Sequence, residues 1–120
     1  MAVRYTIGAE ATRPWGTWHV IDTGPGFVVK RIEVKPGQRL SLQYHEHRAE
    51  IWTVVSGIGI ADVDAERHKI ESGDVVTIPA QARHRLHNAG HEPLVIIEVQ
   101  QGSLLDEEDI IRLADDYRRA

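Results

Sequence analysis

The sequence predicts an all-β fold in which short strands build a sandwich or barrel. Runs rich in Val, Ile, Thr and aromatic residues alternate with turns rich in Gly, Pro, Asn and Asp. These turns recur about every eight to twelve residues, a spacing typical of such folds. The stretch at residues 40–45 also alternates apolar and polar side chains, as a strand with one buried face does.

Each predicted strand ends at a turn signal. Thr23–Gly26, Lys35–Gly37, Gly57–Gly59 and Ser72–Asp74 are turns by their Gly, Pro and Asp content, and Pro79 stops another strand. Residues 1–14 are expected to form an extended N-terminal arm. Strands are expected at residues 18–22, 27–34, 40–45, 51–56, 60–63, 67–70, 75–78, 83–87 and 94–99.

The tail is the one segment expected to be helical, over residues 104–118. Asp106–Asp109 would place negative charge at a helix start, where the helix dipole favours it. Ile110, Leu113, Ala114 and Tyr117 then repeat at helical spacing. We expect an amphipathic helix that caps the sheet.

Composition restricts the classes of function. The chain has 120 residues, 42% hydrophobic and 27% charged, which suits a single globular domain. A net charge of −4 argues against nucleic acid or an acidic membrane as a partner. There is no cysteine, so a metal would need His, carboxylate or amide ligands. No apolar stretch reaches membrane-spanning length and the start lacks a signal-peptide core, so we expect a cytoplasmic protein.

Polar side chains gather between Gly37 and Gly57. In a strand alternate residues share a face, so Gln43, His45 and His47 are expected to point the same way. Glu50 opens the next apolar run and can return beside them across a turn, and a later strand adds His84. Imidazole, amide and carboxylate ligands together suit zinc and related metals. Arg48 is expected to point outward as a salt-bridge partner.

Two segments resemble the paired motifs of the cupin superfamily. The first motif fits Gly37, His45, Glu50 and Gly57, with Gln43 where cupins usually have their first histidine. By this register the metal ligands are Gln43, His45, Glu50 and His84, and His47 is outside the set. The second motif fits the following residues, with Gln81 in place of its middle Gly: Gly73, Pro79, His84 and Asn88.

A wider resemblance covers roughly residues 13 to 118. The chain is similar to the C-terminal cupin domain of type II mannose-6-phosphate isomerase/mannose-1-phosphate guanylyltransferases. The resemblance implies a cupin double-stranded β-helix, or jelly-roll barrel, over residues 1–120. It also implies a divalent metal: zinc first, with cobalt, manganese, iron, nickel or magnesium as alternatives. The matching segments are Arg13–Gly16, Val29–Ile32, Lys35–Glu50, Val54–Gly57, Ile78–Leu86 and Ile97–Gly102.

The function implied is isomerisation of mannose 6-phosphate to fructose 6-phosphate through a metal-stabilised enediolate. A metal-ligated Glu50 is a poor free base, so His47 and His87 are the candidate bases, although the parity of His87 is opposite to that of His84. His47 and Glu50 are the expected catalytic residues. The expected contacts to the sugar phosphate are Lys30, Arg39, Arg85 and Trp52.

Two alternatives stay open: a non-catalytic cupin that binds a sugar or small ligand, and another metal-dependent enzyme such as an oxygenase. The guanylyltransferase domain of the longer proteins is absent from this sequence, so GDP-mannose synthesis is not expected of it alone. Leu40, Leu42 and Tyr44 lie opposite the polar face and need a cover, which favours a homodimer.

Overall fold

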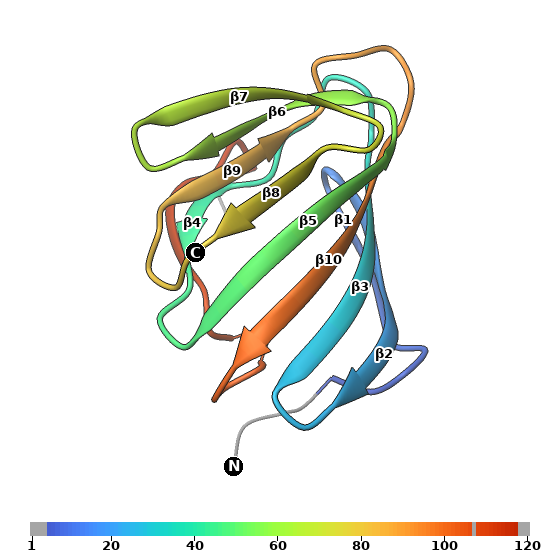
Figure 1. The fold of residues 1–120 in the computed structure, drawn as a ribbon. Coiled ribbons are helices and arrows are strands. Elements are labelled where there is room, and N and C mark those ends of the chain that lie inside the picture. Colours follow the sequence, from blue (N-terminus) through green and yellow to red (C-terminus); the bar gives the residue numbers. More distant parts are fainter. Residues whose placement is uncertain (1–4, 107, 118–120) are drawn as a thin grey trace.

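In the computed structural model, which describes residues 5–106 and 108–117, two antiparallel sheets face each other (Figure 1). The predicted all-β class is confirmed. The first sheet has the order β1 (Glu10–Arg13), β2 (Gly16–Gly24), β3 (Phe27–Val34), β10 (Leu94–Gly102), β5 (Arg48–Ser56) and β8 (Val75–Ile78). The second has the order β11 (Ile111–Ala114), β4 (Leu42–Tyr44), β9 (His84–His87), β6 (Ile58–Val63) and β7 (Glu66–Glu71).

The strands separate an apolar end of the interior from a polar end. On β10 the buried residues alternate along the strand, as the period of two requires. Leu94 and Ile96 come first, and Glu98 and Gln100 follow on the same face. The inner face of β5 runs the opposite way because the two strands are antiparallel, and its buried residues are Arg48, Glu50, Trp52 and Val54.

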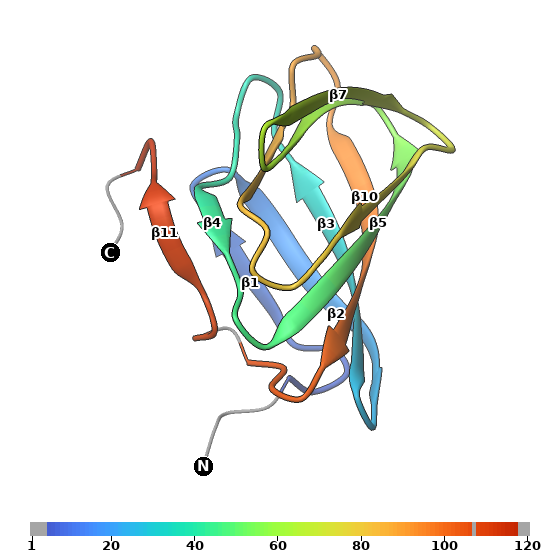
Figure 2. The same cartoon turned by 60° about the vertical axis from the view of Figure 1, so that its left-hand side comes forward.

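The predicted C-terminal helix is wrong. Among the described residues this segment forms β11, an edge strand that pairs with β4 (Figure 2). Successive residues of this segment alternate as they do in a strand: Ile110 and Arg112 line the interior cavity, whereas Ile111 and Leu113 are exposed. A short isolated helix is marginal in water, and the edge of β4 offers backbone hydrogen bonds that outweigh the helical spacing.

The predicted N-terminal arm is partly strand. Residues 10–13 form β1, which pairs with β2 through Thr12↔Thr17 and its neighbours. Residues 1–4, like 107 and 118, lie outside the described residues. None of the described segments forms a helix long and apolar enough to cross a membrane. The homodimer stays a prediction.

The motif glycines explain how the corners between strands are made. Gly37, Gly57 and Gly73 all have positive φ, at 75°, 88° and 93°, where a side chain is strained. Gly57 joins β5 in one sheet to β6 in the other. A Cβ there would lie 2.6 Å from the carbonyl oxygen of Pro93, whereas a Cβ at Gly37 would meet nothing within 4 Å.

Gly57→Ala should therefore destabilise the fold more than Gly37→Ala. Both variants lose about 1–2 kcal/mol because of positive φ. Gly57→Ala should lose about 1–3 kcal/mol more because its methyl group overpacks against backbone atoms. Urea unfolding followed by tryptophan fluorescence measures both, and equal losses would contradict the prediction.

Candidate metal centre

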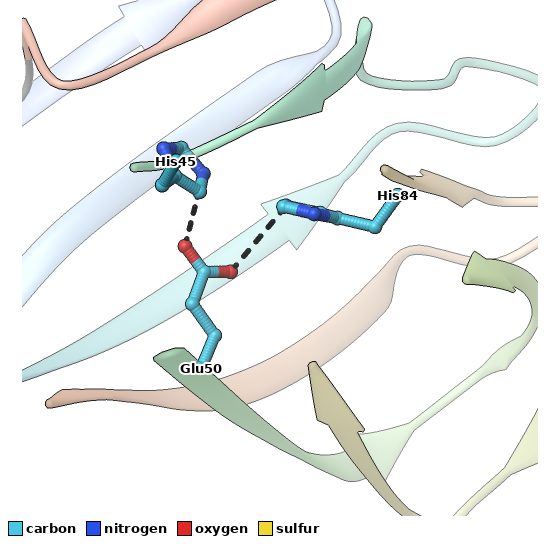
Figure 3. A group of neighbouring side chains, drawn as sticks. All are labelled: His45, Glu50 and His84. Atoms are coloured by element: carbon cyan, nitrogen blue, oxygen red, sulfur yellow. Dashed lines mark ion pairs between the residues drawn. The ribbon is translucent and has the colours of Figure 1, made fainter. Parts of the chain in front are cut away.

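Three buried side chains converge at the polar end of the interior (Figure 3). His45 follows the end of β4, Glu50 lies on β5 and His84 lies on β9, and their ligand atoms all lie within 4.8 Å of one another. His45 Nε2 is 3.1 Å from Glu50 Oε2, and His84 Nε2 is 3.8 Å from Glu50 Oε1. Gln43 is paired with His84 across the β4–β9 ladder and lines the same cavity. The fold thus brings the four predicted ligands together.

Backbone carbonyls fix how both imidazoles are protonated. His45 Nδ1 lies 2.5 Å from the carbonyl oxygen of Asp109, and His84 Nδ1 lies 2.9 Å from that of Ala82. A carbonyl oxygen only accepts hydrogen bonds, so each Nδ1 carries the proton. The other ring nitrogen of each histidine, Nε2, is the one that faces Glu50. An outer carbonyl partner of this kind is usual for metal-ligating histidines.

Two unpartnered atoms show that the site suits a metal ion. Gln43 Oε1 and His84 Nε2 are buried and have no hydrogen-bond partner. Both are electron-pair donors, and burying such atoms unpaired is costly. A divalent cation would satisfy them together with His45 Nε2 and a Glu50 oxygen. Nitrogen and oxygen ligands without thiolate suit zinc, manganese, iron, cobalt or nickel.

Glu50 is held as a carboxylate. Burial raises its pKa, but the nearby Arg48 guanidinium opposes burial, and the pKa is held well below its usual range. Burial in turn lowers the pKa of His84, so its imidazole is neutral and able to bind metal. The site therefore combines one carboxylate anion with neutral electron-pair donors, which are imidazole nitrogen and amide oxygen.

The expected outward direction of Arg48 is wrong, because this side chain is buried beside the candidate metal ligands. Its Nη2 lies 2.9 Å from Glu50 Oε2 and 3.2 Å from His45 Nε2. Its Nη1 donates to the carbonyl oxygen of Asp106 at 3.2 Å. Arg48 lies on β5 with the same parity as Glu50, and this is the sequence signal that could have placed it inside.

A second buried carboxyl group, Glu98, was missed. Trp52 Nε1 donates to both Glu50 Oε1, at 3.0 Å, and Glu98 Oε1, at 3.1 Å. Burial, with the nearby charge of Glu50, raises the pKa of Glu98 to about 8. Gln100 Nε2 donates to Glu98 Oε2 at 2.9 Å. Glu98 shares parity with Leu94 and Ile96 in an apolar strand, and that pattern indicates burial.

The expected phosphate contacts divide into two groups. Lys30 lines the cavity, and its ammonium lies 3.9 Å from the ring centre of Tyr5 and 4.5 Å from that of Trp18. Arg39 instead pairs with Asp116 on the surface, and Arg85 donates to the carbonyl oxygens of Leu40 and Ala114, so neither lines the cavity. Trp52 does line it, as its parity with Glu50 predicts. The other cationic side chains of the lining are Arg13, Arg48 and Arg112.

The candidate base His47 lies outside the cavity lining. Strand β4 ends at Tyr44, so the alternation that placed His47 beside His45 stops before it. Its side chain is 47% exposed and lies 3.6 Å from the Asp109 carboxylate, which also accepts from the backbone of residues 46 and 47. His87 lies on β9 outside the same lining. Neither histidine is placed to act on a ligand bound at the centre.

Comparison with known proteins assigns the chain to a family. Residues 3–115 match the family described as "Mannose-6-phosphate isomerase C-terminal". The chain belongs to this family of cupin domains. Mannose-1-phosphate guanylyltransferase of Escherichia coli is 44% identical over 96% of this chain and 24% of its own length. Alginate biosynthesis protein AlgA of Pseudomonas aeruginosa is 51% identical over 92% of this chain and 23% of its own length.

The chain therefore spans about a quarter of the length of these relatives. The expected isomerase function is wrong by the same comparison. Relatives at 44% and 51% identity are named for guanylyl transfer and alginate biosynthesis, not for isomerisation. The cupin domain is their C-terminal part.

A solved structure confirms the predicted cupin fold. A protein with a double-stranded β-helix domain from Klebsiella pneumoniae superposes with a TM-score of 0.69 at 22% identity. The match covers 96% of this chain and 92% of the other. At this identity the likeness supports the fold and nothing about the ligand.

The raised pKa of Glu98 predicts a pH-dependent stability. Between its ordinary value of 4.5 and about 8, the folded state keeps a proton that the unfolded state has lost. The free energy of unfolding should therefore fall as the pH rises through this window. Glu98→Gln should flatten that fall by at most about 1.4 kcal/mol per pH unit. In Glu98→Gln the amide of Gln100 can rotate so that its Oε1, which has no hydrogen-bond partner, accepts from the amide N–H introduced at position 98.

Denaturant unfolding at several pH values between 5 and 8 measures this slope. Glu33→Gln is the matched control, since Glu33 is exposed on β3, and it should leave the slope unchanged. Identical slopes for Glu98→Gln and the wild type would contradict the assignment.

Proposed function

We propose that this domain binds a divalent metal ion and, beside it, a phosphorylated mannose in the synthesis of polysaccharide precursors. The ligand we propose is mannose 1-phosphate, the sugar in the name of the Escherichia coli relative. The observation that carries the proposal is the convergence of three buried ligand atoms, of His45, Glu50 and His84, within 4.8 Å of one another, beside the unpartnered and buried Oε1 of Gln43.

The cavity lining supports an anionic sugar as the ligand. Lys30, Arg13 and Arg112 bring cationic side chains to the cavity that holds the metal ligands. Guanidinium and ammonium groups bind phosphate through charge-assisted hydrogen bonds. The Lys30 ammonium lies against the aromatic rings of Tyr5 and Trp18, which limits the positions it can take.

Each residue has a definite part in this proposal. Gln43, His45, Glu50 and His84 would hold the metal, and Trp52 would hold the Glu50 carboxylate through its indole N–H. When bound, the ion supplies positive charge that orients and polarises a ligand oxygen. The Asp109 carbonyl keeps the His45 lone pair directed at the site.

Gln43→Ala and His84→Ala should each weaken metal binding at least about tenfold, because each removes a direct ligand. Elemental analysis after dialysis against a metal buffer, and calorimetric titration against a competing chelator, measure the loss. His68→Ala is the control, because His68 lies exposed on β7. Unchanged metal content in both ligand variants would show that the ligand set is wrong.

Lys30→Met should weaken binding of mannose 1-phosphate about 10–100-fold, since it removes one charge-assisted hydrogen bond but keeps the apolar stem. Titration calorimetry of metal-loaded protein with mannose 1-phosphate, mannose 6-phosphate, mannose and inorganic phosphate measures the preference. Arg39→Met is the control, because Arg39 lies on the surface. Equal binding by Lys30→Met and the wild type, or no binding of any phosphorylated sugar, would contradict the proposed ligand.

A further inference from the structure

One guanidinium nitrogen links two atoms that would otherwise repel each other. Arg48 can only donate hydrogen bonds, so His45 Nε2, which lies 3.2 Å from Arg48 Nη2, faces it with a lone pair, and Glu50 Oε2 belongs to a carboxylate. These two acceptors lie only 3.1 Å apart. Arg48 Nη2 lies 3.2 Å from the first and 2.9 Å from the second, and Arg48 Nε donates to the same Glu50 oxygen at 3.0 Å.

A metal ion needs the same two lone pairs. Zinc binds imidazole nitrogen and carboxylate oxygen at roughly 2.0–2.2 Å, so an ion bound to both atoms would lie within roughly 4 Å of Nη2. Two cations this close repel strongly in a buried site. Arg48 is 7% exposed and Glu50 is 2% exposed, so solvent does little to screen them. The present position of Arg48 and a bound ion therefore exclude each other energetically.

We infer that Arg48 is a built-in substitute cation. It neutralises Glu50 when no metal is bound and leaves His45 and Glu50 when a divalent ion binds. The inference rests on the proposed metal site and concerns how that site is emptied and filled. Arg48 is a positioning residue in this scheme, because it acts through the metal ligands.

The surroundings of Arg48 provide a place for it to move. Its Nη1 already donates to the carbonyl oxygen of Asp106, in the segment that leads to β11. The Asp106 side chain is buried and accepts from the backbone N–H of Glu108. A rotation toward Asp106 would keep this contact while releasing Glu50. It would also enlarge a cavity of about 70 Å³, well below the roughly 300–1,000 Å³ usual for small-molecule sites.

The two states of Arg48 differ in which cation faces Glu50. Without the guanidinium, the metal-free protein would keep a buried carboxylate with less compensation. Removing Arg48 should thus destabilise the metal-free state more than the metal-bound state. By linkage, the free energy of metal binding must become more favourable by the difference between these two destabilisations. A residue that merely oriented Glu50 for the metal would have the opposite effect, because its loss would weaken binding.

The test compares Arg48→Met with the wild type in zinc titrations against a competing chelator. We expect at least tenfold tighter zinc binding, and a larger rise in melting temperature on adding zinc, in Arg48→Met. Arg67→Met is the matched control: it removes an arginine that pairs bidentately with Asp62 on the surface, and zinc affinity should not change. Arg48→Lys, which keeps the charge but loses the fork of donors, should give an intermediate affinity and serves if Arg48→Met does not fold.

A second measurement follows Arg48 itself in the intact protein. The Nε–Hε resonance of Arg48, assigned by comparison with the Arg48→Lys spectrum, should shift on saturation with zinc, whereas that of Arg67 should not. Unchanged or weaker zinc binding in the Arg48 variants, or an Arg48 resonance that zinc leaves in place, would overturn the inference. If the wild type and all variants bind no zinc, manganese or cobalt, the proposed metal site itself fails.

Discussion

The polar end of this cupin depends on one constraint: several electron-pair donors are buried together, and two of them have no hydrogen-bond partner. Gln43, His45, Glu50 and His84 all direct acceptor atoms inward, and their positions follow from strand parity and two backbone carbonyls. Such a cluster is stable only with positive charge inside it. Arg48 provides that charge in the present conformation, but it reaches only His45 and Glu50.

The same constraint divides the interior between structure and chemistry. On β10 and β5 the inner face changes from apolar to polar within a single strand, so one pair of sheets contains both a hydrophobic core and the candidate metal centre. Trp52 lies where the two meet. Its ring is buried with the core, and its N–H holds two carboxyl groups.

Much of this arrangement could be predicted from the sequence. The turn residues and alternating strands indicated an all-β fold, and the motif spacing brought His45, Glu50 and His84 together, with Gln43 paired across the ladder with His84. Prediction failed where tertiary contacts outweigh local pattern. The tail repeats its apolar residues at helical spacing, yet the open edge of β4 makes it a strand. His47 lies outside the cavity lining because β4 ends at Tyr44. The family resemblance identified the fold but did not establish the reaction.

The hydrogen bond from His45 to Asp109 links the centre to a late part of the domain. The other ligand contacts are complete once the chain has reached β9, but the carbonyl that fixes the His45 tautomer lies just before β11. A ribosome must therefore add more than twenty residues after His84 before the His45 imidazole is locked in place. During synthesis the His45 imidazole would therefore take its final orientation late, after most of both sheets has been made.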